Sequence, residues 1–336
     1  MKIVIEHRSV PDAQVMPKLK ALGEVVTLKD RKDETVIQEL RDADAFTYLG
    51  ASTPVTRKMM EAAPKLKILA RGGVGTDGID KVAATELGIV VTNGPGVSAN
   101  AVAENAVALA FALSRNVALV DRAMREGRGW QINVDPVVRE RHMEIRGKTW
   151  GVIGHGMIGS LAASKANGLG CTVVYNKRHR LTPEEEKKQN IKYLSFEELL
   201  RVSDIISMHL PLNSETEGII NKNTLKLVKP TAMFINQSRG KVVNDPDMVE
   251  WLKANPLAGY GTDVWEQEPP PNDHPLFKLD NAVCTPHQGG GTRDNRLASS
   301  MLVYENVANV LNGKDPVTPV NTEVLKSPKL RYKAKR

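Results

Sequence analysis

The sequence predicts an α/β protein built from two Rossmann- or flavodoxin-like domains, each a doubly wound parallel sheet, with a cleft between them. Short β-branched runs alternate with longer helix-period segments almost throughout the chain, and this alternation implies parallel strands joined by right-handed crossovers. A long alanine-rich segment and a charged stretch separate two such series. With 336 residues, the chain is long enough for two separate hydrophobic cores.

The first series of elements accounts for the first hundred residues. Its expected strands are short apolar, β-branched runs: Lys2–His7, Glu24–Leu28, Ala45–Leu49, Lys67–Arg71 and Val90–Asn93. The helices expected between them repeat their apolar residues with a helical period: Asp12–Leu22, Glu34–Arg41, Thr56–Ala63 and Ile79–Glu86. Gly88 follows the last of these helices, at a position where a helix commonly ends with positive φ.

The second series follows one long helix, which the alanine-rich pattern predicts from Ala99 to about Gly127. A charged stretch over residues 137–148 then leads into the strand Thr149–Ile153. The later expected strands are again short and apolar: Thr172–Tyr175, Asp204–Leu210, Ala232–Gln237, Ala258–Thr262 and Ala282–Thr285. A final helix over Asp294–Leu311 precedes a proline-containing tail.

The composition is that of a globular cytoplasmic protein. The longest apolar stretches, such as Ala106–Leu113, fall well short of the roughly 20 residues of a membrane span. Met1–His7 is typical of a strand rather than of a targeting signal. The formal net charge is +7, but the tail from Lys326 carries six Lys and Arg residues and no acidic one. We therefore expect a solvated, frayed end and neither nucleic-acid nor membrane binding.

Two cysteines indicate a reducing compartment rather than a disulfide framework. Cys171 and Cys284 each lie in an apolar, strand-like run. Because Cys284 precedes His287 by three residues, a reactive thiol is the alternative to the expected buried cysteine. No metal site is predicted.

A glycine-rich motif predicts where a dinucleotide binds. Its six residues, Gly154, His155, Gly156, Met157, Ile158 and Gly159, follow the strand Thr149–Ile153 and open a helix. The first glycine allows a tight turn, the second lets the backbone approach a pyrophosphate, and the third lets helix and strand pack closely. The helix N-terminus then presents free N–H groups to the phosphates. A glycine-rich turn without a ligand is the alternative.

The end of the next strand indicates which nicotinamide cofactor fits. NAD sites usually place Asp or Glu there to bind the ribose hydroxyls, whereas this chain has Asn176, Lys177, Arg178 and Arg180. The asparagine removes a carboxylate that would repel a 2′-phosphate, and the cations can hold that dianion through charge-assisted hydrogen bonds. A solvated charged loop is the alternative. The position of the loop beside the adenosine ribose favours NADPH over NADH.

Three residues of suitable chemistry each follow a strand-like run. Arg239 lies in NQSRG, Glu268 follows DVW, and His287 lies in TPHQGG. Because ligands of open α/β sheets bind outside the carboxyl ends of the strands, the three side chains are expected to converge. Any one of them alone is more commonly an ordinary loop residue. The three together, downstream of a dinucleotide motif, favour a catalytic set.

These residue types suit the reduction of a carbonyl group. Hydride arriving at a 2-oxo carbon leaves negative charge on the oxygen, which needs a proton and a nearby cation. His287 is the natural proton donor, and Glu268 would bond its other ring nitrogen, fixing the tautomer and favouring the protonated ring. Arg239 would bind the substrate carboxylate and polarise its carbonyl.

Seven stretches together resemble the D-isomer-specific 2-hydroxyacid dehydrogenase family over nearly the whole chain. They are GGVGTDGID from Gly72, SANAVAENAVALAFAL from Ser98, GKTWGVIGHGMIG from Gly147, HLPLNSET from His209, NQSRGKVVND from Asn236, DVWEQEP from Asp263 and TPHQGG from Thr285. Several of these in the family's order are highly specific. The resemblance implies an NAD(P)-dependent enzyme that interconverts 2-oxo and D-2-hydroxy acids, with Arg239, Glu268 and His287 as its catalytic arginine, glutamate and histidine.

The resemblance also implies roles for further residues. The backbone amides of Val74 and Gly75 would bind the substrate carboxylate, with Leu49 lining the pocket. Asp263 would contact the nicotinamide carboxamide, and the remaining cofactor contacts would come from His209, Leu210, Pro211, Thr216, Gln237, Ser238, Gly289 and Gly290. Residues 1–98 plus 292–336 would form a discontinuous substrate domain, and residues 99–291 the NAD(P)-binding Rossmann domain. Family members pair through their cofactor domains, so a homodimer is expected.

Departures within the resemblance guide the substrate prediction. Val74 stands where the phosphite-oxidising branch has lysine, and Ser98 where formate dehydrogenases have asparagine. The loop over residues 48–52 carries no base to hold a phosphate. The basic loop after Tyr175 is similar to that of NADPH-using glyoxylate and hydroxypyruvate reductases. A small, unphosphorylated 2-oxo acid is therefore expected; the alternatives are 3-phosphoglycerate dehydrogenase, a cofactor-sensing corepressor-like binding protein and a hydrolase of the adenosylhomocysteine type.

Overall fold

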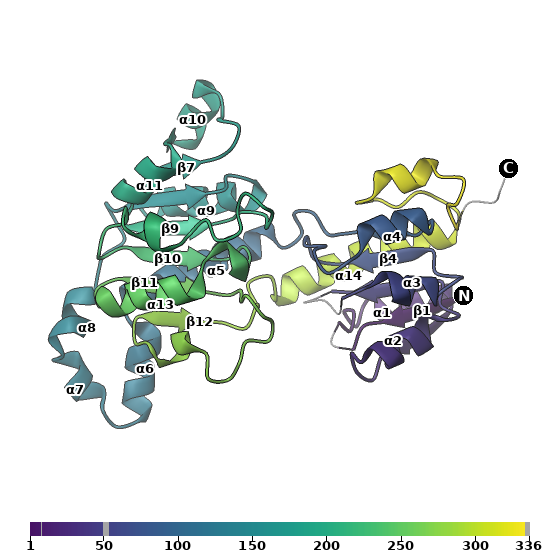
Figure 1. Cartoon of the computed structure of the whole chain (residues 1–336), viewed down its shortest axis with the longest axis horizontal. Helices are drawn as coiled ribbons and strands as arrows, with labels where there is room; N and C mark the ends of the chain where they lie inside the picture. Colours follow the sequence, from purple (N-terminus) through teal and green to yellow (C-terminus); the bar gives the residue numbers. More distant parts are fainter. Residues whose placement is uncertain (8, 50–53, 333–336) are drawn as a thin grey trace. The chain divides into compact units, whose positions relative to one another are not determined.

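The computed structural model describes residues 1–7, 9–49 and 54–332. Contacts within the chain divide it into two compact units (Figure 1). Unit 1 comprises residues 1–98 and 290–336, and unit 2 comprises residues 99–289. Each unit is an α/β structure with one parallel sheet, as the alternation of strands and helices predicts.

The sheet of unit 1 has five parallel strands in the order β2-β1-β3-β4-β5. The strands are β1 (Lys2–Ile5), β2 (Glu24–Thr27), β3 (Ala45–Tyr48), β4 (Ile68–Arg71) and β5 (Val90–Thr92). Their helices are α1 (Met16–Leu22), α2 (Asp33–Leu40), α3 (Arg57–Glu61), α4 (Lys81–Glu86) and α14 (Arg293–Leu311), with the short 3-10 helix η3 (Thr322–Lys326). The expected strands are present, with ends that differ by one or two residues.

Both faces of this sheet are buried. Successive side chains of a strand point to opposite sides of the sheet, and each set packs against helices. Val4, Phe46 and Leu69 pack in one core with residues of α2, α3 and α4. Their neighbours Ile3 and Ile68 pack on the other side with residues of α1 and α14. The near-continuous apolar runs of these strands follow from this double covering.

The sheet of unit 2 has seven parallel strands in the order β12-β11-β10-β9-β6-β7-β8. The strands are β6 (Thr149–Ile153), β7 (Thr172–Asn176), β8 (Ile191–Tyr193), β9 (Ile205–Met208), β10 (Met233–Asn236), β11 (Gly259–Thr262) and β12 (Ala282–Cys284). The larger helices are α5 (Ala99–Ser114), α9 (Met157–Gly168), α10 (Pro183–Gln189), α11 (Phe196–Val202) and α13 (Asp245–Ala254). The shorter ones are α12 (Lys222–Leu225), η1 (Gly240–Val242) and η2 (Pro275–Lys278). The three-residue edge strand β8 was not expected, because so short a run carries little periodicity.

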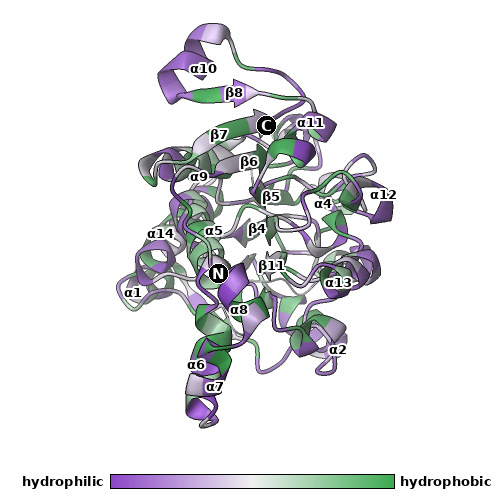
Figure 2. Cartoon of the chain, turned by 90° about the vertical axis from the view of Figure 1, so that its left-hand side faces the viewer, coloured by the Kyte–Doolittle hydropathy of each residue, from purple (hydrophilic) through white to green (hydrophobic). Residues whose placement is uncertain are grey.

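Helices cover both faces of this second sheet. Residues of α5 and α9 pack with Trp150 and Ile235 in one core. Residues of α11 and α13 pack with Ile206 and Phe234 in the other. In Figure 2 the apolar colouring follows strands such as β7, whereas the outlying helix α10 is hydrophilic.

The expected single helix from Ala99 to Gly127 is wrong. The segment forms two helices, α5 and α6 (Val117–Arg125), which meet at an angle of 61°. Asn116 stands between them with φ of +48°, a left-handed conformation that asparagine tolerates better than most residues. Its side-chain amide donates to the Val138 carbonyl (3.2 Å), so a distant backbone group stabilises the break.

Two short helices follow α6: α7 (Gly129–Asn133), which precedes the charged stretch, and α8 (Pro136–Arg141), which covers the beginning of it. Figure 1 shows α6, α7 and α8 projecting from the rest of unit 2. By length and composition, no single helix of the described ranges could cross a membrane; only α5 and α6 taken together, despite their bend, pass that test.

The prediction of a frayed basic tail is wrong for the residues up to 332. The Arg331 guanidinium donates to the carbonyls of Ala63 (2.7 Å) and Leu66 (3.1 Å). Tyr332 is buried, and its hydroxyl donates to Asp315 (2.7 Å). This part of the tail therefore belongs to unit 1 because it satisfies backbone groups there; residues 333–336 lie outside the described part of the chain.

Candidate active site

The glycine-rich turn lies between the ends of two neighbouring strands. Strand β6 pairs with β7 on one side and β9 on the other. The Gly154 amide donates to the Asn176 carbonyl (3.0 Å), and the His209 amide donates to the Ile153 carbonyl (2.8 Å). Gly154 has φ of +90°, and a Cβ there would lie 2.5 Å from the His209 carbonyl oxygen. The turn is therefore possible only with glycine at this position.

Helix α9 begins directly after this turn with its N-terminus open. Its N-cap is Gly156, which offers no side chain to the free amide groups, and its first turn contains no acidic residue. A Cβ on Gly156 would have no atom within 4 Å. Unpaired N–H groups and the helix dipole thus face open space, which is the arrangement that binds a pyrophosphate.

Several buried polar side chains of unit 2 have no hydrogen-bond partner among the described residues. They are Asn105 (Nδ2), His155 (Nε2), His209 (both ring nitrogens) and Gln237 (Nε2). Burial, and secondarily the nearby His155, lowers the pKa of His209 to about 4, so its ring is neutral at pH 7. Because buried polar groups are normally bonded, these unsatisfied groups and the open helix end fit a bound nicotinamide dinucleotide.

The side chains of the basic loop after β7 differ in their partners. The Asn176 side-chain amide donates to the Leu194 carbonyl (2.9 Å). Arg180 makes a two-pronged ion pair with Glu186 (2.7 and 3.0 Å), and Arg178 pairs with Glu215. Among the residues described, Lys177 is in no ion pair.

A short hydrogen bond joins two of the predicted catalytic residues. His287 Nδ1 lies 2.7 Å from Glu268 Oε2, and the Trp265 amide donates to Glu268 Oε1 (3.2 Å). Burial raises the pKa of Glu268, but the hydrogen bond and charge of His287 outweigh it, and the net pKa lies below the usual value. His287 has φ of +54°, a strained conformation for histidine that is typical of functional positions.

Asp263 holds the loop that carries His287. Its Oδ1 accepts from the Thr285 hydroxyl (2.6 Å) and the Gln288 amide (2.9 Å), and its Oδ2 accepts from the Gly289 amide (2.7 Å). Asp263 follows β11 and the loop follows β12, which are neighbouring strands. One buried carboxylate thereby orders the whole segment on both sides of His287.

Arg239 leaves the end of β10 in a turn organised by Asn236. The Asn236 carbonyl oxygen of the side chain accepts from the amide (3.0 Å) and hydroxyl (2.7 Å) of Ser238, and its amide donates to the Arg239 carbonyl (3.0 Å). The charge of Arg239 contributes to the lowered pKa of Glu268. Arginine, glutamate and histidine thus come from the ends of three adjacent strands, β10, β11 and β12.

Comparisons with known proteins agree with this geometry. The family described as D-isomer specific 2-hydroxyacid dehydrogenase, NAD binding domain, matches residues 107–289. A glyoxylate reductase of Korarchaeum cryptofilum is 37% identical over 326 residues, 96% of this chain and 97% of the relative. The chain belongs to the D-isomer specific 2-hydroxyacid dehydrogenase family.

Two further similarities extend this result. A D-3-phosphoglycerate dehydrogenase of Archaeoglobus fulgidus is 37% identical over 86% of this chain and 53% of the relative. The crystal structure of an acyclic imino acid reductase with NADPH and D-Arg has a TM-score of 0.82 and 31% identity, covering 95% of this chain and all of the other. This dehydrogenase is therefore an NAD(P)-dependent oxidoreductase of 2-oxo and 2-hydroxy acids, which confirms the predicted family, fold and enzymatic function.

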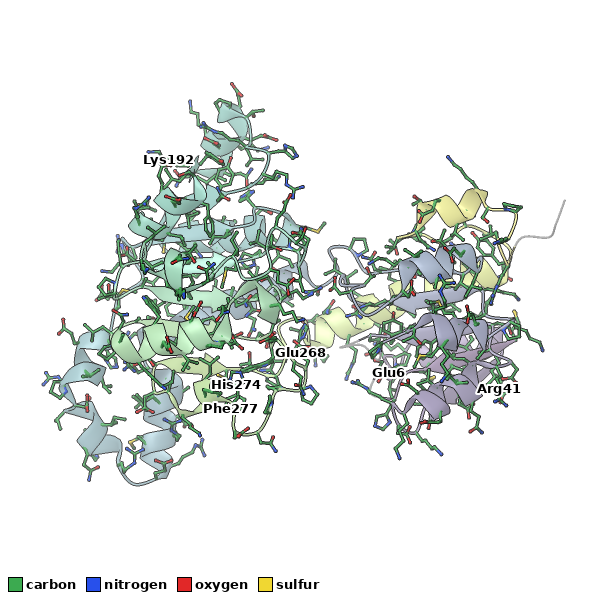
Figure 3. All side chains as sticks on the ribbon, in the orientation of Figure 1. Glu6, Arg41, Lys192, Glu268, His274 and Phe277 are labelled. Atoms are coloured by element: carbon green, nitrogen blue, oxygen red, sulfur yellow. The ribbon has the colours of Figure 1, made fainter. Side chains whose placement is uncertain are left out.

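A residue outside the predicted set also supports the candidate active site of this dehydrogenase. The Trp265 indole donates to the Thr285 carbonyl (3.1 Å), and its ring packs edge-on against His274 and Phe277, each with centroids 5.2 Å away. The rings of His274 and Phe277, labelled in Figure 3, also contact each other, with centroids 5.6 Å apart. Trp265 therefore ties the glutamate to the histidine loop; its place in the DVW stretch was the only sequence signal.

The residues predicted to bind substrate through unit 1 occupy two strand-end loops of the dehydrogenase. Val74 is exposed, and its carbonyl accepts from the Asn93 side-chain amide (2.8 Å). No acceptor among the described residues takes the amide hydrogens of Val74 or Gly75. Leu49 is half-buried against the core of unit 1, and residues 50–52 of the expected pocket loop lie outside the described part of the chain.

Proposed function

We propose that this dehydrogenase reduces a small, unphosphorylated 2-oxo acid of the glyoxylate or hydroxypyruvate type, using NADPH. The hydrogen-bonded pair of Glu268 and His287 beside Arg239 carries the proposal. The name of the Korarchaeum relative, glyoxylate reductase, supports the substrate class.

The residues divide the reduction into binding, polarisation and proton transfer. When bound, a nicotinamide cofactor would supply the hydride for the 2-oxo carbon. Arg239 binds the substrate and polarises its carbonyl, because guanidinium donors strengthen as charge develops on the oxygen. His287 uses Nδ1 to donate to Glu268, so that Nε2 is left to deliver a proton to the nascent alkoxide. Glu268 stays ionised and orients the ring, as the carboxylate of a catalytic triad does.

The substrate carboxylate has a second set of donors in the proposal. The free amides of Val74 and Gly75 would bind it, and Leu49 would limit the size of the substrate side chain. Replacing Leu49 with Ala should therefore raise kcat/KM for a bulky phenyl-substituted pyruvate relative to glyoxylate. An unchanged ratio would remove Leu49 from the pocket.

The loop after β7 would determine the cofactor preference. Lys177 and Arg178 would hold the 2′-phosphate of NADPH, while the amide of Asn176 avoids the repulsion that a carboxylate would cause. Arg180 already forms an ion pair with Glu186, so it would contribute to binding of the 2′-phosphate only through its position near that group. The complex of the imino acid reductase with NADPH supports this cofactor in a related fold.

The test is a steady-state assay that follows oxidation of NADPH and of NADH. The substrates are glyoxylate, hydroxypyruvate, pyruvate and a phosphorylated hydroxypyruvate. Faster turnover of the unphosphorylated acids with NADPH is expected. Preference for the phosphorylated acid would instead favour a 3-phosphoglycerate dehydrogenase, the name of the Archaeoglobus relative. Preference for NADH would refute the assignment of the basic loop.

We propose in addition that the enzyme is a homodimer formed through α6, α7 and α8. These helices and the turn between α7 and α8 expose large apolar side chains: Val117, Met124, Trp130, Val134 and Val137. Trp130 is 80% exposed, and such clusters usually mark interfaces. Sedimentation should find a dimer for the wild type and a monomer for Trp130→Glu. A monomeric wild type would refute the proposal.

A further inference from the structure

An ion pair joins the two loops that flank the glycine-rich turn. Arg178 lies after β7, and Glu215 lies in the loop after β9. These strands are the neighbours of β6, which leads into the turn. The pair therefore spans the two sides of the proposed adenosine site, at the position where a 2′-phosphate would meet Arg178.

The second arginine of the loop is held in a different way. Arg180 stacks over the Tyr193 ring (5.3 Å) and makes its two-pronged bond to Glu186. Glu186 is buried and also accepts from the Tyr175 hydroxyl (2.8 Å), which in turn accepts from the Leu181 amide (2.9 Å). Removing Arg180 from this cluster would leave a buried carboxylate short of donors, so Arg180 stays in place.

Among the residues that the structure describes, the side chains of Arg178 and Glu215 have no such additional partners. Their side chains are 67% and 68% exposed, and pairs this exposed change an equilibrium by no more than about fivefold. A phosphate dianion offers Arg178 more charge and more acceptor oxygens than a carboxylate does. Exchange of Glu215 for a 2′-phosphate is therefore favourable, whereas a ribose hydroxyl cannot replace the carboxylate.

We propose that Glu215 is a specificity-determining residue, an exchangeable counter-ion that the 2′-phosphate displaces from Arg178. Glu215 lowers the affinity for NADP(H) by competing for the arginine. It leaves the affinity for NAD(H) nearly unchanged, because NAD(H) binds without disturbing the pair. This inference rests on the proposed preference for NADPH.

The test measures binding of NADP⁺ and NAD⁺ to the whole enzyme by calorimetry. Glu215→Gln should tighten NADP⁺ binding by about three- to fivefold, the range expected for an exposed pair, with NAD⁺ unchanged. In an Arg178→Ala background the same substitution should have no effect, because a double-mutant cycle isolates the interaction of the two side chains. Glu217→Gln is the matched control: it removes the same charge from an exposed residue of the same loop that makes no ion pair among the residues described.

The outcomes separate the inference from the function on which it rests. Wild-type enzyme that binds NAD⁺ as tightly as NADP⁺ would refute the cofactor preference itself. Wild-type preference for NADP⁺ with no gain in Glu215→Gln would refute only the role of Glu215. Equal gains in Glu217→Gln, or a gain that persists without Arg178, would mean that general charge rather than exchange sets the affinity, and would also overturn the inference.

Discussion

Replacing Glu268 with Gln tests the central hydrogen bond of the active site. The amide has nearly the same shape, so the packing around it is kept, while the negative charge facing His287 is lost. Under the proposed mechanism, in which Glu268 orients the proton donor His287, the chemical step should become slower. Binding of the cofactor should be unchanged, because Glu268 does not lie in the glycine-rich turn.

The size of the effect follows from the geometry. The Nδ1–Oε2 distance is 2.7 Å, and hydrogen bonds to charged groups contribute about 1.5–3 kcal/mol. The two side chains are 30% and 37% exposed, so water screens the pair and the lower end applies. Because about 1.4 kcal/mol corresponds to a factor of ten, kcat/KM should fall about tenfold in Glu268→Gln. Glu268→Ala removes the hydrogen-bond acceptor altogether and should lower kcat/KM about a hundredfold.

The assay is the pH profile of kcat/KM with glyoxylate and NADPH, together with the Kd of NADPH. The pKa of Glu268 lies below its usual 4.5. The glutamate is therefore ionised and supports activity above pH 4.5, and it becomes protonated only when the pH falls below that value. Wild-type kcat/KM should therefore show an acid limb below about pH 4.5, which Glu268→Gln should lack. His287→Gln, which removes the proton donor, is the reference for full loss of turnover. Glu268→Gln activity within about twofold of wild type, well inside the tenfold estimate, would refute the reasoning.

Three further substitutions or treatments follow from the structure. Trp265→Phe keeps the ring contacts but loses the indole hydrogen bond; unfolding free energy should fall by about 1 kcal/mol in denaturant titrations, and an unchanged value would exclude a role for that bond. Asn116→Ala, at φ of +48°, should lower the unfolding free energy by about 1–3 kcal/mol, and a neutral effect would contradict the account of the helix break. Burial raises the pKa of the Cys171 thiol to about 11 and that of Cys284 to about 12, so iodoacetamide should label neither until the protein is unfolded; rapid native labelling of Cys284 would restore the reactive-thiol alternative.

Local pattern was sufficient for the order of strands and helices. A strand covered on both faces is apolar along its whole length, and a glycine-rich turn between strand and helix is readable from six consecutive residues such as Gly154–Gly159. The catalytic candidates were also readable, because Arg239, Glu268 and His287 each follow a strand, and parallel strands bring their carboxyl ends to one edge. The sequence by itself therefore determined the fold class and the enzyme class, and it identified the candidates for the site.

Only the tertiary structure decided the features that depend on partners distant in sequence. The break at Asn116 depends on the Val138 carbonyl, which no helical period reveals. The three cations of the basic loop look equivalent in sequence, yet Glu186 holds Arg180 firmly and Glu215 holds Arg178 weakly. Hydrogen bonds and ion pairs of this kind form between residues that the fold brings together, so their partners and strengths follow from the folded arrangement and not from spacing along the chain.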